Sequence, residues 1–71
     1  MATLKNESTG LTYRINRFGS RTFEVYVSKP TSAIGPISAQ WKTNLEGAKR
    51  AWEEALKQGC IPTEGSSVGM L

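Results

Sequence analysis

The chain has 71 residues, a formal net charge of +3, 38% hydrophobic residues, one cysteine and no histidine. This length suits one small hydrophobic core and leaves no room for a second domain. No apolar stretch approaches the roughly 20 residues of a membrane span, and no secretory signal opens the sequence, so we expect a cytoplasmic protein with no membrane partner.

The positive charge is concentrated in the middle of the chain. Residues 11–43 hold five basic side chains against one glutamate, a net charge of +4. Residues 44–58 hold three side chains of each sign, residues 1–10 hold one of each, and residues 59–71 carry a single glutamate. This distribution favours an acidic partner for the middle segment.

The first predicted elements form a hairpin. Residues 1–10 are polar with little periodicity, so we expect a loose lead-in. Residues 11–16 and 22–28 then alternate apolar and polar side chains and are rich in β-branched and aromatic types. This period-two pattern predicts two strands, and Gly19 between them predicts the turn.

The loop length of this hairpin sets which side chains face one another. A two-residue loop would set Ile15 opposite Glu24 and so bring a charge onto the apolar face. A three-residue loop at residues 18–20 sets Ile15 opposite Phe23 and keeps the apolar side chains together. The same register sets Arg14 opposite Glu24, and we expect these two charges to compensate each other.

Two further arginines flank the predicted turn. Arg17 and Arg21 face each other across the mouth of the hairpin, with no acidic residue to neutralise them. Such a pair is typical of an exposed edge that resists aggregation. The alternative is contact with an acidic partner, with Lys29 and Lys42 in support.

A third strand and a helix follow. Residues 37–42 alternate again and predict a short strand. The helix begins after Thr43 or Asn44, either of which is a suitable N-cap, and ends near Gln58, before Gly59. The predicted apolar stripe of the helix consists of Leu45, Ala48, Trp52, Ala55 and Leu56.

The aromatic side chains divide between core and surface. Trp41 and Trp52 fall at inward positions of the third strand and the helix, and we expect both to anchor the core. Tyr26 is then the one clear outward aromatic. Gly47, inside the helix, either lets a strand approach closely or has no structural consequence.

These elements predict an α+β fold, a three-stranded antiparallel sheet packed on one C-terminal helix (β-β-β-α) with flexible termini. The expected division is a lead-in over residues 1–10, a single domain over residues 11–58 and a flexible tail over residues 59–71. The excess positive charge of residues 11–43 therefore lies in the segment that is predicted to form the sheet.

The sequence does not indicate an enzyme. Without histidine, a general base would have to come from scattered glutamates, lysines or Cys60, and these form no recognisable constellation. We expect no cofactor and no metal, because no ligand spacing or glycine-rich phosphate loop occurs. Cys60 follows the helix end, whose partial negative charge raises the pKa of a thiol, so we expect a structural cysteine.

The helix and the first strand resemble the plant AP2/ERF DNA-binding domain. The residues Ala48-Lys49-Arg50-Ala51-Trp52-Glu53-Glu54-Ala55 are similar to that family's Ala-x-Arg-Ala-aromatic-acidic-acidic-Ala pattern, and Tyr13-Arg14 is similar to the Tyr-Arg of its first strand. Three strands followed by one helix is also the layout of the arm-binding domains of tyrosine integrases. A lower-ranked resemblance is to the last three strands and final helix of a double-stranded-RNA-binding domain.

The first resemblance, which covers residues 11–58, implies a helix behind the sheet and an outer sheet face that enters the major groove of DNA. The residues that it implies as groove-facing are Arg14, Asn16, Tyr26, Gln40 and Lys42. It also implies phosphate contacts for Arg17 and Arg21 at the hairpin.

Two classes of function follow from these observations. The first hypothesis is a small nucleic-acid-binding module, such as an accessory protein of a phage or mobile element, with DNA favoured over RNA. The second is a protein-binding module that recognises an acidic protein surface, such as a phage-encoded inhibitor of a host protein or nucleoprotein complex. The exposed edges of a three-stranded sheet also offer a route to a homodimer.

Overall fold

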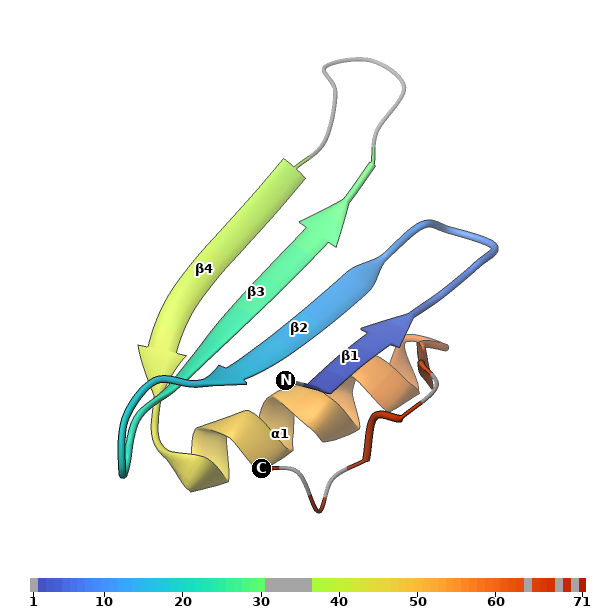
Figure 1. Ribbon diagram of the computed structural model, residues 1–71. Helices are drawn as coiled ribbons and strands as arrows, with labels where there is room; N and C mark the ends of the chain where they lie inside the picture. Colours follow the sequence, from blue (N-terminus) through green and yellow to red (C-terminus); the bar gives the residue numbers. More distant parts are fainter. Residues whose placement is uncertain (1, 31–36, 64, 68, 70) are drawn as a thin grey trace.

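One helix lies across one face of an antiparallel sheet in the computed structural model of the chain (Figure 1). The structure describes residues 2–30, 37–63, 65–67, 69 and 71. Its elements are β1 (Ala2–Lys5), β2 (Thr12–Arg17), β3 (Phe23–Lys29), β4 (Ile37–Thr43), α1 (Leu45–Lys57) and β5 (Ile61–Pro62). The predicted α+β class, with an antiparallel sheet and one helix, is confirmed.

The predicted number of strands is wrong, because the sheet has five strands in the order β4-β3-β2-β1-β5. Strand β1 pairs with β2, and β5 pairs with the other side of β1. Both lie in segments that we expected outside the sheet, residues 1–10 and 59–71. They are four and two residues long, and so short a segment forms a strand through its pairing rather than through its own pattern.

A side-chain clamp holds the turn after β1 against the end of the helix. Asn6 Oδ1 accepts hydrogen bonds from the backbone of Ser8 at 2.9 Å and of Thr9 at 3.2 Å. Asn6 Nδ2 donates to the carbonyl of Gln58 at 3.0 Å. Gly59, at φ 81°, ends the helix beside this clamp, where a Cβ would lie 2.8 Å from Asn6 Nδ2. Glycine is therefore required there by both conformation and space.

The core lies between α1 and strands β1 to β3. The sheet contributes apolar side chains at alternate positions, and the helix contributes mainly alanines, which let it approach the sheet closely. The buried core residues are Ala2, Leu4, Tyr13, Ile15, Phe23, Val25, Ala48, Ala51, Trp52, Ala55 and Cys60.

The position of the helix corrects our expectation for Trp41. Trp52 is buried as predicted, but Trp41 remains 43% exposed. The helix stripe is also shifted, since Ala51 is buried while Leu45 and Leu56 are 40% and 47% exposed. The added strand β1 moves the middle of the sheet away from β4, so the helix covers β1 to β3 and leaves Trp41 beside an uncovered edge (Figure 1).

The helix begins and ends as predicted, and its start explains Gly47. Asn44 is the N-cap, and its side chain accepts from the backbone of Gly47 at 2.9 Å. A Cβ on Gly47 would clash with Thr43 Oγ1 and would lie 2.8 Å from Thr43 Cβ. Of the two alternatives for Gly47, the structure shows the first, a close approach by the end of β4.

The hairpin register differs from the predicted one by two residues. Ile15 pairs with Val25, and Arg17 pairs with Phe23, which leaves a five-residue loop at residues 18–22 in place of three. The loop is closed by a hydrogen bond from the backbone of Phe18 to the carbonyl of Thr22 at 2.7 Å. A shift of two residues keeps every side chain on its predicted face, because side chains alternate with period two. It changes only which side chains are neighbours.

Candidate nucleic-acid interface

The sheet face opposite α1, called the outer face below, is polar over strands β1 to β4. Alternation along each strand and the pairing of the strands define its members. The outward side chains are Thr3, Lys5, Thr12, Arg14, Asn16, Glu24, Tyr26, Ser28, Ser38, Gln40 and Lys42. Beyond β1, the exposed Ile61 of β5 stands next to Lys5. All five residues implied as groove-facing therefore share this face.

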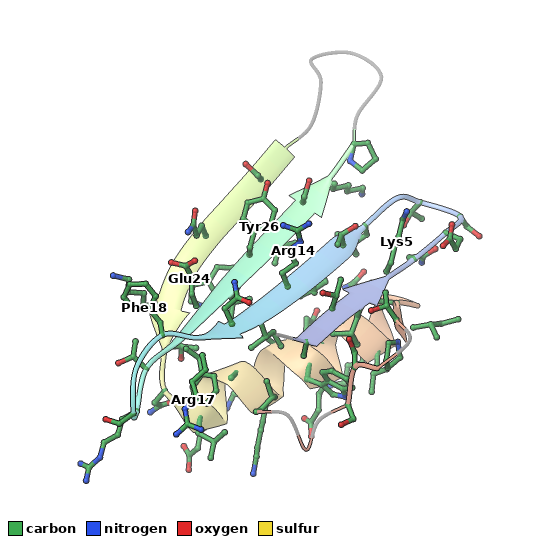
Figure 2. The ribbon with its side chains drawn as sticks, viewed as in Figure 1. Lys5, Arg14, Arg17, Phe18, Glu24 and Tyr26 are labelled. Atoms are coloured by element: carbon green, nitrogen blue, oxygen red, sulfur yellow. The ribbon has the colours of Figure 1, made fainter. Side chains whose placement is uncertain are left out.

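Four outward side chains form one straight row across the sheet, called the central row below. Thr3 pairs with Arg14, Arg14 with Tyr26, and Tyr26 with Gln40. Neighbouring strands lie about 4.8 Å apart, so the row spans roughly 14 Å. It brings a guanidinium, a phenol ring, an amide and a hydroxyl into line on an open surface, where Arg14 and Tyr26 lie side by side (Figure 2).

The observed register removes the predicted compensation of Arg14 by Glu24. Glu24 lies opposite Asn16 on one side and Lys42 on the other. The directly opposed neighbours of Arg14 are Thr3 and Tyr26, both uncharged. Arg14 is exposed, and its charge is therefore available at the centre of the outer face.

An aromatic and a lysine meet where β4 passes the hairpin loop. Phe18 is 57% exposed, and Lys42 Nζ lies 4.4 Å from the centre of its ring. Such a cation–π contact contributes about 0.5–1 kcal/mol at an exposed site. Sequence reasoning assigned Phe18 only to the turn. The signal that could have revealed it is the presence of an aromatic residue in a turn between two strands, where little of it can be buried.

Arg17 and Arg21 do not belong to the outer face. By register, Arg17 points to the helix side of the sheet, beside Phe23. Its Nε donates to the carbonyl of Gly19 at 3.1 Å, and its Nη2 donates to the carbonyl of Ser20 at 3.2 Å. Both arginines line a depression of about 290 Å³ next to the first turn of α1. Arg17 holds the hairpin loop, and the pair lies on the opposite side from the central row.

The outer face of the sheet has a net positive charge. It carries Lys5, Arg14 and Lys42 against Glu24, three cations and one anion, a net charge of +2. The helix carries three basic and three acidic side chains, and Arg17 and Lys29 point to the helix side of the sheet, so the positive charge is not confined to the outer face. Lys5 was missed because β1 was not predicted, although Thr3 and Lys5 do alternate with the apolar Ala2 and Leu4.

The remaining reactive side chains lie in the core. Burial raises the pKa of the Cys60 thiol. Burial is also the main cause of the raised pKa of Tyr13, to which the nearby Glu54 and Cys60 add. Within the described ranges, no three histidine, cysteine or acidic side chains come together to hold a metal ion. The only helix in those ranges is too short and too polar to cross a membrane.

Comparison with known proteins does not add to this geometry. No protein-family model, curated protein or solved structure matches the chain. The resemblance to AP2/ERF and tyrosine-integrase domains therefore stays a prediction from the sequence.

Proposed function

We propose that the protein is a small nucleic-acid-binding module whose outer face contacts the ligand, with DNA favoured over RNA. The observation that carries this proposal is the central row, with Arg14 and Tyr26 adjacent on a polar, net positive face. Proteins that bind nucleic acids combine cations for phosphates with hydrogen-bonding or aromatic side chains for bases. The central row supplies the second kind of group.

Each side chain of the row has a role that its chemistry supports. Arg14 can donate two hydrogen bonds to the acceptors of guanine in a major groove, and Gln40 can pair in the same way with adenine. Tyr26 offers a ring for stacking and a hydroxyl for hydrogen bonding. These are the groups that would read bases.

The lysines of the outer face suit the phosphates. Lys5 on β1 and Lys42 on β4 stand at opposite corners, one on each side of the central row. Strand spacing and rise place them roughly 20 Å apart. A nucleic acid lying over the row would therefore meet a cation on each flank.

Salt dependence tests this proposal. Fluorescence anisotropy with labelled duplex DNA, single-stranded DNA and RNA should show binding at low salt, and the logarithm of the affinity should fall with the logarithm of salt with a slope of about −2 to −3. Lys42→Ala should reduce the magnitude of that slope by about 1. Lys49→Ala, on the helix, removes the same charge and should leave the slope unchanged.

The uncovered inner side of β4 favours a second candidate, a protein-binding module, because Trp41 is exposed there beside a free strand edge. The two candidates differ in their ligand. Absence of binding to all three nucleic acids at low salt, together with a purified protein partner that Trp41→Ala no longer binds, would favour the second over the first.

A further inference from the structure

The two edges of the sheet differ in how readily they could pair with another strand. The β5 edge is two residues long and contains Pro62, which lacks a backbone donor. The β4 edge is seven residues long, has no proline, and has Lys42 as its single charged residue. Proteins commonly protect exposed edges with prolines, charges or short strands, and β4 has little of this protection.

The inner side of β4 is also uncovered. Trp41 and Ala39 both point to the helix side, and both are exposed. Trp41 borders a groove of about 360 Å³ between β4 and α1. Its lining residues are Tyr13, Trp41, Gly47, Arg50, Ala51 and Glu54. A free strand edge and an exposed tryptophan thus occur on the same strand.

We propose that a second copy of the chain occupies this edge, with β4 paired antiparallel to β4 about a two-fold axis at Gln40. Gln40 is the midpoint of Ile37–Thr43, so this register pairs all seven residues of both strands. It sets Gln40 opposite Gln40, and the large Trp41 opposite the small Ala39 of the other copy on the inner side.

Other registers are less favourable. A shift that places inner side chains opposite outer ones is excluded, because both strands must present the same faces in one sheet. An axis at Trp41 or at Ala39 preserves the faces but pairs five residues of each strand in place of seven. The axis at Gln40 is therefore the register with the most backbone hydrogen bonds.

The charges on β4 are compatible with this register. Lys42 lies opposite the uncharged Ser38 of the other copy, and the two copies of Lys42 lie about 14 Å apart. That separation exceeds the screening length of about 8 Å at physiological salt. No like charges on β4 therefore face each other directly.

The resulting dimer has one continuous sheet with both helices on the same side. The two outer faces join across Gln40, so the central row runs from β1 of one copy to β1 of the other. Five strand spacings separate the two copies of Arg14 by about 24 Å. This inference stands without the proposed function, and its tests contain no nucleic acid.

Disulfide trapping tests the register directly. In an antiparallel pair, directly opposed Cα atoms lie about 4.5–5.5 Å apart, within the range of about 4.4–6.8 Å that a disulfide accepts. Gln40→Cys should therefore form a disulfide-linked dimer under mild oxidation. Ser38→Cys is the matched control on the same face, because its copies would lie about 14 Å apart, too far for a disulfide.

Two controls keep the trapping experiment decisive. The wild-type chain should not be trapped, because its own Cys60 is buried. Circular dichroism of Gln40→Cys should match that of the wild type, since Gln40 is exposed. Equal trapping of Gln40→Cys and Ser38→Cys, or trapping of neither, would overturn the register.

Sedimentation of the untreated protein tests the dimer itself. A single strand pair is a small interface, so we expect a weak dimer with a dissociation constant of about 1–100 μM. Trp41→Ala should raise that constant about tenfold, because truncating a large aromatic anchor of a small interface typically costs more than 1 kcal/mol. A wild type that stays monomeric at about 500 μM would overturn the proposal, whatever else the chain binds.

Discussion

The two faces of the sheet are made by the same strands and have opposite chemistry. On β2, Tyr13 and Ile15 are buried against the helix, while Arg14, between them, is exposed. The inner face supplies the apolar burial that stabilises so small a domain. The outer face supplies none of it, so its row of hydrogen-bonding side chains calls for a different explanation. Substitutions on the two faces should therefore separate folding from binding.

The sharpest separation should come from neighbouring residues of β1. Leu4 is fully buried, and Leu4→Ala should lower the free energy of unfolding by about 2–5 kcal/mol through lost burial and the cavity left behind. Lys5 is on the outer face, and Lys5→Ala should change it by less than about 0.5 kcal/mol. Urea denaturation measures both. Equal stability of Leu4→Ala and the wild type would mean that β1 is not part of the folded sheet.

Alternation predicted which side chains of β2, β3 and β4 share the outer face, but not which of them are neighbours. A shift of two residues leaves faces unchanged, so Arg14, Asn16 and Tyr26 could be placed correctly with the wrong register. Which residue stands beside Arg14 depended on the loop length, and in the observed five-residue loop Arg17 donates hydrogen bonds to two of the loop carbonyls. The alternation of apolar and polar residues does not show when a side chain hydrogen-bonds to its own loop.

The predicted core failed at Trp41 for a related reason. Trp41 was expected inside because it falls at an inward position of the predicted third strand. Strands β1 and β5 are four and two residues long, and the brief alternation in β1 is too short to distinguish a strand from a polar lead-in. Once β1 joins the sheet, the helix packs farther from β4, and the exposure of Trp41 follows.

A substitution at the junction between β4 and α1 should also change the stability of the fold without changing the outer face. Gly47→Ala would improve helix propensity by about 1 kcal/mol, but its Cβ would clash with Thr43. We expect overpacking to prevail and the free energy of unfolding to fall by about 1–2 kcal/mol. Thermal denaturation measures the change. A stabilised variant would show that Thr43 gives way at no cost.

Arg17 should affect stability rather than binding. Arg17→Ala removes two hydrogen bonds from an exposed guanidinium to the loop and should cost about 1 kcal/mol. Arg21→Ala is the matched control and should have little effect on urea denaturation. Equal losses in both variants would argue against the role of Arg17 in holding the loop.

The smallest effect should come from the buried thiol. Because burial raises the pKa of Cys60 in the folded chain, the folded state keeps a proton that the unfolded state has lost. The free energy of unfolding should therefore fall as the pH rises from about 8.5, the ordinary thiol value, through the raised folded value. Urea denaturation of the wild type and Cys60→Ala across this range should show a shallower decline in the variant. Identical declines would exclude a contribution from Cys60.

The most direct test of the outer face compares Arg14→Ala with Arg21→Ala in the same anisotropy assay. Both variants lose one arginine from the same hairpin, so their change in net charge is identical. The account predicts that Arg14→Ala weakens nucleic-acid binding about tenfold, or ~1.4 kcal/mol, while Arg21→Ala stays within about twofold of the wild type. Equal losses in the two variants, or a larger loss from Arg21→Ala, would contradict binding through the central row.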